Sequence, residues 1–363
     1  MAKIKSIRRL AMAWALLAAT QQSPANETHQ VISENGETNI VERIDFPAGQ
    51  IKDVIPAGDK YIIHADPIDS LKNSVAKDAL FVMQKNNPNA AFGRTFSTPI
   101  HSVAYVPGLD IAVWSYESAY STNLLEVAQG QSALKAAASN SGFVTTNRQR
   151  RFYPEASLFA STANTVWEIG PNDSKQHVLN FDQQGYQENC IGVHVDLLSS
   201  DGLVAGDQHS TFALRSVSNP TMLTHNIFDG ASQMHTIPDM GKPISMAAVA
   251  TDSKGDGYLL FGYENGEIKS AHHSSEIIDD FNESIHAFSG PVTSMTGTDH
   301  GSVLAVSATN PTMVEMEPNL DGRREIMPNQ NETGYRKVIS DGNEALLLSN
   351  TASNYFYRVY RAR

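Results

Sequence analysis

Cysteine is almost missing from this chain of 363 residues, in which Cys190 is the single copy. One cysteine excludes an intrachain disulfide, and it also excludes the zinc, iron–sulfur and c-type haem sites that need cysteine pairs. Stability must therefore come from a sizeable core, which a chain of this length can bury. Because Cys190 adjoins an apolar run, we expect a buried, inert thiol.

Basic residues and long apolar runs are also scarce. Lys and Arg number 27 against 39 Asp and Glu, a net charge of −12. Nucleic-acid binding depends on phosphate neutralisation, so this balance indicates no nucleic-acid partner. Beyond the first segment, no stretch approaches the roughly 18 apolar residues of a membrane helix, so we expect no transmembrane segment in the mature chain. With 24 Gly and 16 Pro, the composition excludes collagen-like and low-complexity chains.

Residues 1–25 have the layout of a secretory signal peptide. Four Lys and Arg residues, and no acid, precede an apolar run of 10 residues, and small residues at positions 23 and 25 provide a cleavage site. We predict a periplasmic or secreted protein, whose net charge changes from −12 to −16 once those four basic residues are removed. A disordered basic start and an organelle transit peptide are the alternative interpretations.

Short apolar runs recur along the rest of the chain. Seven of them, each followed by turn residues, align as the second strand of a repeated unit. They begin at Tyr61, Asp110, Ser157, Gly202, Tyr258, Val303 and Ala345. The intervals between these starts are 49, 47, 45, 56, 45 and 42 residues. Such a period in an all-strand sequence is typical of a β-propeller.

Further strands flank these runs. Asn265-Gly266, a strong hairpin signal, joins the second strand of its unit to a third. The clearest preceding strands are at 243–251 and 291–299, and fourth strands are expected at 177–181 and 222–228. The sequence therefore predicts four-stranded antiparallel blades, seven times over.

The two ends of the chain complement each other. The last unit, from residue 335 onward, stops one strand short, and an unassigned strand at 38–46 precedes the first unit. We predict that this strand pairs beside 355–360 and closes the ring, because an open ring would leave exposed edges. Residues 26–37 are then a flexible leader, and residues 38–363 a single seven-bladed β-propeller domain.

This organisation resembles the WD-repeat-like seven-bladed β-propeller superfamily. The resemblance covers most of residues 38–363 and is best at 243–271 and 291–317, which follow the order strand, turn, apolar strand, Asn/Asp turn, strand. The Gly-His and Trp-Asp dipeptides of the better repeats are absent, and Trp167 is the one tryptophan near the expected third-strand position. The resemblance implies the architecture and transfers no active site.

Other architectures fit the same pattern. A ring of six or eight blades and a pair of β-sandwiches are the alternatives. We interpret 229–242, within the interval of 56 residues, as a long loop because it contains two glycines and a proline. Residues 131–138 suit either a helix or an outer strand.

Reactive motifs are absent. The chain has no Gly-x-Ser-x-Gly, Gly-x-Gly-x-x-Gly, P-loop or His-x-x-x-His, so we expect no cofactor. Among the 12 histidines, His64, His194 and His209 lie in or just after inner strands, where a ring would bring them near its axis. They are the residues to inspect for a metal. Packed histidines bonded to the backbone are the alternative interpretation.

Clusters of arginine and tyrosine supply the candidate binding residues. Both residue types are favoured in protein interfaces, although a solvated outer strand explains the same pattern. The candidates are Tyr116, Tyr120, Arg148, Arg150, Arg151 and Tyr153. The loop 229–242 is a further candidate, and Arg358, Arg361 and Arg363 form a second basic cluster at the end of the chain.

These observations favour a non-enzymatic propeller that binds a protein partner or serves as a scaffold in a multi-subunit assembly of the envelope or the extracellular space. The argument rests partly on fold analogy. A propeller hydrolase or lyase with an axial metal site is the second hypothesis. The third is a propeller that binds a sugar or small ligand, with Trp114 or Tyr263 stacking in an axial pocket.

Overall fold

The computed structural model of the chain describes residues 27–33, 36–46, 49–67, 76–97, 99–100, 102–106, 111–115, 118–123, 135–139, 143–146, 158–161, 165–169, 175–180, 203–205, 210–215, 221–226, 232–236, 243–251, 257–273 and 283–362. All the secondary-structure elements in these ranges are strands, so the prediction of an all-β chain is confirmed. The predicted signal peptide and Cys190 lie outside the described residues.

The strands form antiparallel sheets of four, with one sheet of five. The first sheet is β3 (Ile51–Ala57), β4 (Lys60–Ala65), β5 (Asp78–Gln84) and β6 (Asn87–Phe96). The second is β7 (Ser102–Val106), β8 (Ile111–Ser115), β9 (Ser118–Asn123) and β10 (Lys135–Ser139). The third is β11 (Phe143–Thr146), β12 (Leu158–Ser161), β13 (Thr165–Ile169) and β14 (Lys175–Asn180).

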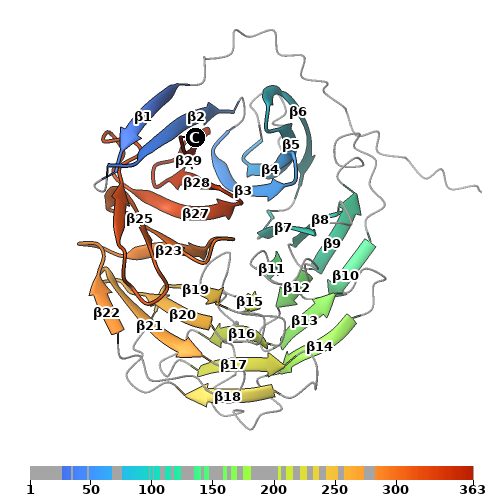
Figure 1. Ribbon diagram of the computed structural model, residues 1–363. Coiled ribbons are helices and arrows are strands. Elements are labelled where there is room, and N and C mark those ends of the chain that lie inside the picture. Colours follow the sequence, from blue (N-terminus) through green and yellow to red (C-terminus); the bar gives the residue numbers. More distant parts are fainter. Residues whose placement is uncertain are drawn as a thin grey trace, which may run out of the picture.

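The second half of the chain continues this pattern. The next sheets are β15 (Leu203–Ala205), β16 (Ser210–Arg215), β17 (Thr221–Asn226) and β18 (Ser232–Thr236), then β19 (Ser245–Ala250), β20 (Gly257–Gly262), β21 (Glu267–His273) and β22 (Glu283–His286). They are followed by β23 (Val292–Gly297), β24 (Val303–Ser307), β25 (Asn310–Met316) and β26 (Arg324–Ile326). The sheet of five is β27 (Tyr335–Asp341), β28 (Glu344–Ser349), β29 (Tyr355–Arg361), β2 (Thr38–Asp45) and β1 (Thr28–Ile32). The sheets lie around a common centre, with the first-named strand of each nearest to it (Figure 1).

The pairing predicted for the two chain ends is confirmed. β2 lies antiparallel beside β29, with Asn39 opposite Arg361 and Asp45 opposite Tyr355. The first and last parts of the chain therefore share one sheet.

The expected flexible leader at 26–37 contains a strand. Residues 28–32 form β1, which pairs with β2 in a register that places Thr28 opposite Glu42 and Ile32 opposite Thr38. Val31 packs against the buried cluster below it, which gives this short segment an anchor. The prediction of a leader was wrong for these residues because an edge strand of five residues has too few apolar side chains to signal itself in the sequence.

Neighbouring sheets pack face to face, and this explains the continuous apolar runs. All five residues of β24 are buried, because both faces of its sheet are covered. Between the sheet of five and the first sheet, Ile339 and Leu346 pack with Ile63 and Phe81 in one buried cluster. Such strands show no alternation of apolar and polar residues.

Side chains of the innermost strands bond to the next sheet. Ser245 Oγ on β19 donates to the carbonyl of Val292 on β23 at 2.6 Å. Thr293 Oγ1 on β23 donates to the carbonyl of Tyr335 on β27 at 2.8 Å. These bonds hold successive inner strands together where the sheets converge.

The last inner strand bonds to the first in the same manner. Arg336 on β27 donates to the carbonyls of Ile51 at 2.5 Å and Lys52 at 2.8 Å on β3. The neighbouring Lys337 forms an ion pair with Asp53 at 2.7 Å. The sheet that contains both chain ends is thus bonded to the sheet that follows it in the chain.

The strand order was misassigned in one repeat. The run that begins at Gly202 forms β15, an inner first strand rather than a second strand, and 222–228 contributes β17, a third strand rather than a fourth. The expected loop 229–242 contains the fourth strand, β18. First and second strands are both buried on two faces, so apolar content alone does not distinguish them. Residues 131–138 were expected to form either a helix or an outer strand, and residues 135–138 belong to the outer strand β10.

Candidate functional site

Most of the predicted binding residues lie outside the described part of the chain. Tyr116, Arg148, Arg150, Arg151 and Tyr153 belong to that group. Tyr120 lies on β9, opposite Trp114 of β8 and Ala136 of β10. The proposal of a basic and aromatic cluster therefore stays a prediction.

His64, the one described member of the predicted axial histidines, is packed inside the first sheet. Its side chain is 5% exposed, and its Nε2 lies 3.2 Å from Asp78 Oδ1. Lys52 binds the same carboxylate oxygen and also pairs with Asp66 at 2.9 Å. Within the described ranges, no group of three or more His, Cys, Asp or Glu residues is placed to hold a metal ion. His194 and His209 lie outside those ranges.

Asp78 is the centre of this buried polar group. Burial alone would raise the pKa of the Asp78 carboxyl, but contacts with His64 and Lys52 and a hydrogen bond from Ile100 N, at 2.5 Å, outweigh it. The pKa of Asp78 therefore lies below its ordinary value. Bonded to His64, Lys52 and Ile100 N, the ionised Asp78 carboxylate stabilises the sheet. A lowered pKa keeps the carboxylate ionised, whereas a carboxyl group that donates a proton needs a raised pKa.

Tyr263, the predicted stacking residue, is also structural. It is 8% exposed and follows β20, with Lys269 Nζ placed 5.3 Å from the centre of its ring. Its carbonyl accepts a hydrogen bond from Val292 N at 3.0 Å and so anchors the next sheet. Tyr263 is therefore part of the packing between neighbouring sheets.

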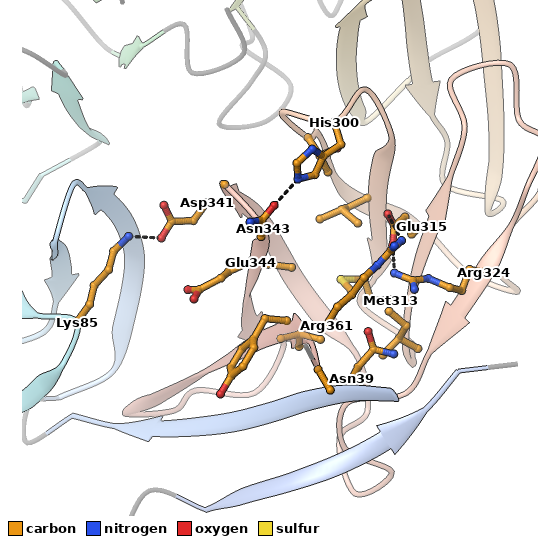
Figure 2. Close-up of a pocket in the computed structure, with 18 residues that line it drawn as sticks. Asn39, Lys85, His300, Met313, Glu315, Arg324, Asp341, Asn343, Glu344 and Arg361 are labelled. Atoms are coloured by element: carbon orange, nitrogen blue, oxygen red, sulfur yellow. Dashed lines mark hydrogen bonds and ion pairs between the residues drawn. The ribbon is translucent and has the colours of Figure 1, made fainter. Parts of the chain in front are cut away.

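A cavity of about 640 Å³ opens where turns of three sheets meet the chain ends, and Lys85 comes from the turn between β5 and β6. The turn between β27 and β28 lines one side, residues at the β23–β24 turn and on β25 and β26 line the other, and the start of β2 and the end of β29 lie between them (Figure 2). Its polar lining comprises Asn39, Lys85, Thr298, His300, Glu315, Arg324, Asp341, Asn343, Glu344, Tyr360 and Arg361. This volume is typical of ligand-binding cavities.

A second cavity of about 530 Å³ adjoins the first. Both are lined by His300, Glu315, Arg324 and Arg361, so these four residues form their common wall. The turn between β25 and β26 supplies the far side of the second cavity. We refer to the two cavities together as the groove.

A buried guanidinium organises the common wall. The Arg324 side chain is 7% exposed and forms ion pairs with Glu37, which precedes β2, and with Glu315 of β25. Arg361 lies 3.6 Å from Glu37 and 3.5 Å from Glu315 and is 60% exposed. Because those contacts are longer than good hydrogen bonds, the Arg361 guanidinium keeps donors available to a ligand.

The opposite side of the groove carries a second set of paired charges. Lys85 forms an ion pair with Asp341, and His300 bonds to Asn343 across the opening (Figure 2). Glu344 lies 3.6 Å from Arg358 Nε. Burial raises the pKa of Glu344, and Arg358 only partly offsets the effect.

The sequence showed little of this site. Its residues come from both ends of the chain and from turns about 40 residues apart, which the repeat brings together only in the fold. The one signal was the basic cluster at the end of the chain, of which Arg361 lines the groove. Residues such as Arg324 and Glu315 belong to no recognisable sequence motif, so the sequence did not mark them as site residues.

Comparison with known proteins identifies the fold and no family. No family model matches the chain, and no curated protein matches it. A solved virginiamycin B lyase from Staphylococcus aureus is similar with a TM-score of 0.58 and 9% identity, covering 89% of this chain and 100% of the lyase. The RRP9 WD40 repeats give a TM-score of 0.58 and 7% identity, covering 93% and 100%. A chain of the mitotic checkpoint complex gives 0.57 and 12%, covering 88% and 94%.

These likenesses show that the chain has a β-propeller fold similar to that of WD40 repeats. At 7 to 12% identity they carry the fold and no activity. Among the described residues there is no helix long and apolar enough to cross a membrane.

Proposed function

We propose that this chain is an exported, non-enzymatic propeller of seven blades that binds a protein partner through the groove. Support for seven blades comes from the described sheets, one of five strands and six of four. Support for a closed ring comes from the β2–β29 pairing and from the bonds of Arg336 and Lys337 to β3. The layout of residues 1–25 supports export to the periplasm or the extracellular space.

The groove is the observation that carries the binding function. Its charges are held by ion pairs, while Arg361, His300 and Asn343 are exposed at its opening. Preformed charged groups around a hollow give specificity for a complementary surface. One of the similar structures is a set of WD40 repeats and another is a chain of a mitotic checkpoint complex, and the second likeness supports a role in protein interaction.

Arg361→Ala tests the proposal. The variant removes an exposed guanidinium from both cavities and leaves Arg324 with its two carboxylates. Arg323→Ala is the matched control, because Arg323 is also partly exposed but lines neither cavity. The tagged chains are expressed in the native host, crosslinked and purified, and the associated proteins are quantified.

We expect one protein to copurify stoichiometrically with the unchanged chain and with Arg323→Ala, and to fall at least tenfold with Arg361→Ala. Equal recovery with all three chains would refute the groove as the binding site. Recovery of the free chain alone would refute the binding function. N-terminal sequencing of the same material tests export, which predicts a mature chain that begins near residue 26.

A further inference from the structure

β1 is an outer edge strand without the usual protection against pairing. Its sequence, Thr-His-Gln-Val-Ile, contains no charged residue and no proline. Proteins normally protect edges with charged side chains, proline or bulges. Of the seven outermost strands that the structure describes, five carry a charge, and only β1 and β18 do not. β1 differs from β18 because it is added to a sheet that already has four strands.

The hydrogen bonds beside β1 show which of its backbone groups are committed. Arg43 N donates to Glu27 O at 2.9 Å, and Ser33 N donates to Glu37 O at 2.9 Å. These two pairs lie at either end of the β1–β2 register. In an antiparallel ladder, successive residues bond alternately to one side and the other. The odd-numbered residues of β1 therefore bond toward β2, and the even-numbered ones direct their N–H and C=O groups away from it.

The outward-facing residues are Thr28, Gln30 and Ile32, and among the described strands β2 is the single neighbour of β1. We propose that a second copy of this chain pairs with this edge, antiparallel, about a two-fold axis through Gln30. That register places Thr28 of one copy opposite Ile32 of the other and Gln30 opposite itself. These three pairs are then of the hydrogen-bonded kind, which gives about six backbone bonds across the interface.

The side chains of the three outward-bonding residues, which share one face of β1, support this register. Thr28, Gln30 and Ile32 are all exposed, and Ile32 is 72% exposed, the highest value among the large apolar side chains of the described residues. In the paired form, each Ile32 side chain would lie beside Thr28 of the other copy, a contact between two β-branched residues that favours strand pairing. The other two side chains keep their contacts within their own copy. His29 bonds to the Pro328 carbonyl, and Val31 packs against the buried cluster.

Charge also favours this edge as the meeting place of two copies. The chain is acidic, with a net charge of −12, so two copies repel each other over most of their surface. In the proposed register, Glu27 lies opposite Ser33 of the other copy, so no two like charges face each other directly along the edge. A self-complementary strand of this kind gives a closed, isologous dimer.

The test places charges at the two-fold axis. Gln30→Lys and Gln30→Glu each bring two like charges face to face, and mixing the two variants brings opposite charges together. Ser284→Lys, on the exposed outer strand β22, is the matched control. Molar mass is measured by sedimentation equilibrium on the full chain from about 1 to 100 μM, a range suited to a small interface.

We expect the unchanged chain and Ser284→Lys to dimerise, and each Gln30 variant to dimerise at least tenfold more weakly. The equimolar mixture should regain the dimer. A chain that stays monomeric over the whole range would overturn the proposal. A dimer unaffected by either Gln30 variant would overturn it too and would direct attention to β18. Thermal unfolding controls for folding, because an outward-facing, exposed residue should leave the melting temperature almost unchanged.

Discussion

Two kinds of single residue stabilise this fold: glycines at positions where a side chain would be strained, and buried charged residues with ion-pair partners. Gly266 belongs to the first kind. It has φ +85° in the turn between β20 and β21, and a Cβ there would overlap the carbonyl oxygen of Phe288. Its own carbonyl accepts hydrogen bonds from Ala287 N and Phe288 N. The turn thereby positions the segment that leads to the next sheet.

Gly266→Ala should lower the free energy of unfolding by about 3 kcal/mol, since backbone strain and overlap with the Phe288 carbonyl add together. Gly342→Ala is the control, because Gly342 also has a positive φ, +61°, but has open space around its Cβ position. It should lose about 1 kcal/mol. Urea unfolding measures both, and equal losses would contradict the role of the overlap.

Asp78 belongs to the second kind, and its depressed pKa gives a pH dependence. Its contribution to stability is complete above the pKa of the unfolded chain, about 3.9, and is lost as the pH falls through the lower pKa of the folded state. Asp78→Asn should lower the free energy of unfolding at pH 7 by about 3 kcal/mol, because Lys52 loses its buried partner. The variant should also lose less stability than the unchanged chain between pH 5 and pH 2.

Urea unfolding at a series of pH values measures this difference. The control is Asp59→Asn, which alters an exposed carboxylate beside Lys60. Its unfolding should follow the pH dependence of the unchanged chain closely. Parallel pH curves for Asp78→Asn and the unchanged chain would show that Asp78 does not supply the acid sensitivity.

At the scale of elements, the ion pairs of Arg324 fasten three separate strands. Arg324 lies on β26, Glu315 on β25, and Glu37 directly before β2. The N-terminal strands are thus bonded to the neighbouring sheet as well as to β29. Removal of the guanidinium leaves two carboxylates close together and partly buried, with Arg361 as the nearest compensating charge.

Arg324→Ala should therefore lower the free energy of unfolding by about 3 kcal/mol. The double variant Arg324→Ala, Glu315→Ala should recover part of the loss, since it removes one of the repelling carboxylates. Hydrogen exchange should show faster exchange at β2 in the single variant than in the unchanged chain. Unchanged protection of β2 would mean that the ion pairs do not hold this strand.

The sequence predicted most of the described strands and missed the edge strand β1. The apolar run that begins at Val303 was recognisable as a strand because both faces of β24 are buried and all its residues are therefore apolar or small. The apolar sequence of β15 likewise made it resemble a second strand, and this moved the assignments of β17 and β18 by one place. β1 escaped notice because only one of its side chains reaches the core.

At the scale of the whole molecule, the groove depends on how the chain ends meet. Asn39 and Arg361 lie opposite each other in the β2–β29 pair, and both line the first cavity together with turns from three sheets. Periodicity in the sequence predicted that the ends would pair. It did not predict which side chains would gather there, because side-chain clusters depend on the geometry of turns and not on the spacing of strands.

The extra strand β1 also determines how the molecule resists being pulled. The chain enters β1 at the end of the sheet where Arg43 lies and leaves β29 at the opposite end, where Asn39 lies. Tension applied to the two ends therefore slides the strands along each other and strains all their hydrogen bonds at once. In a chain that began at β2, the same tension would peel the strands apart one bond after another. Deletion of residues 27–37 should accordingly lower the rupture force in single-molecule stretching, and an equal force would show that β1 carries no load. A strand of five residues thus gives the pairing between the two parts of the chain mechanical strength without altering which strands that pairing joins.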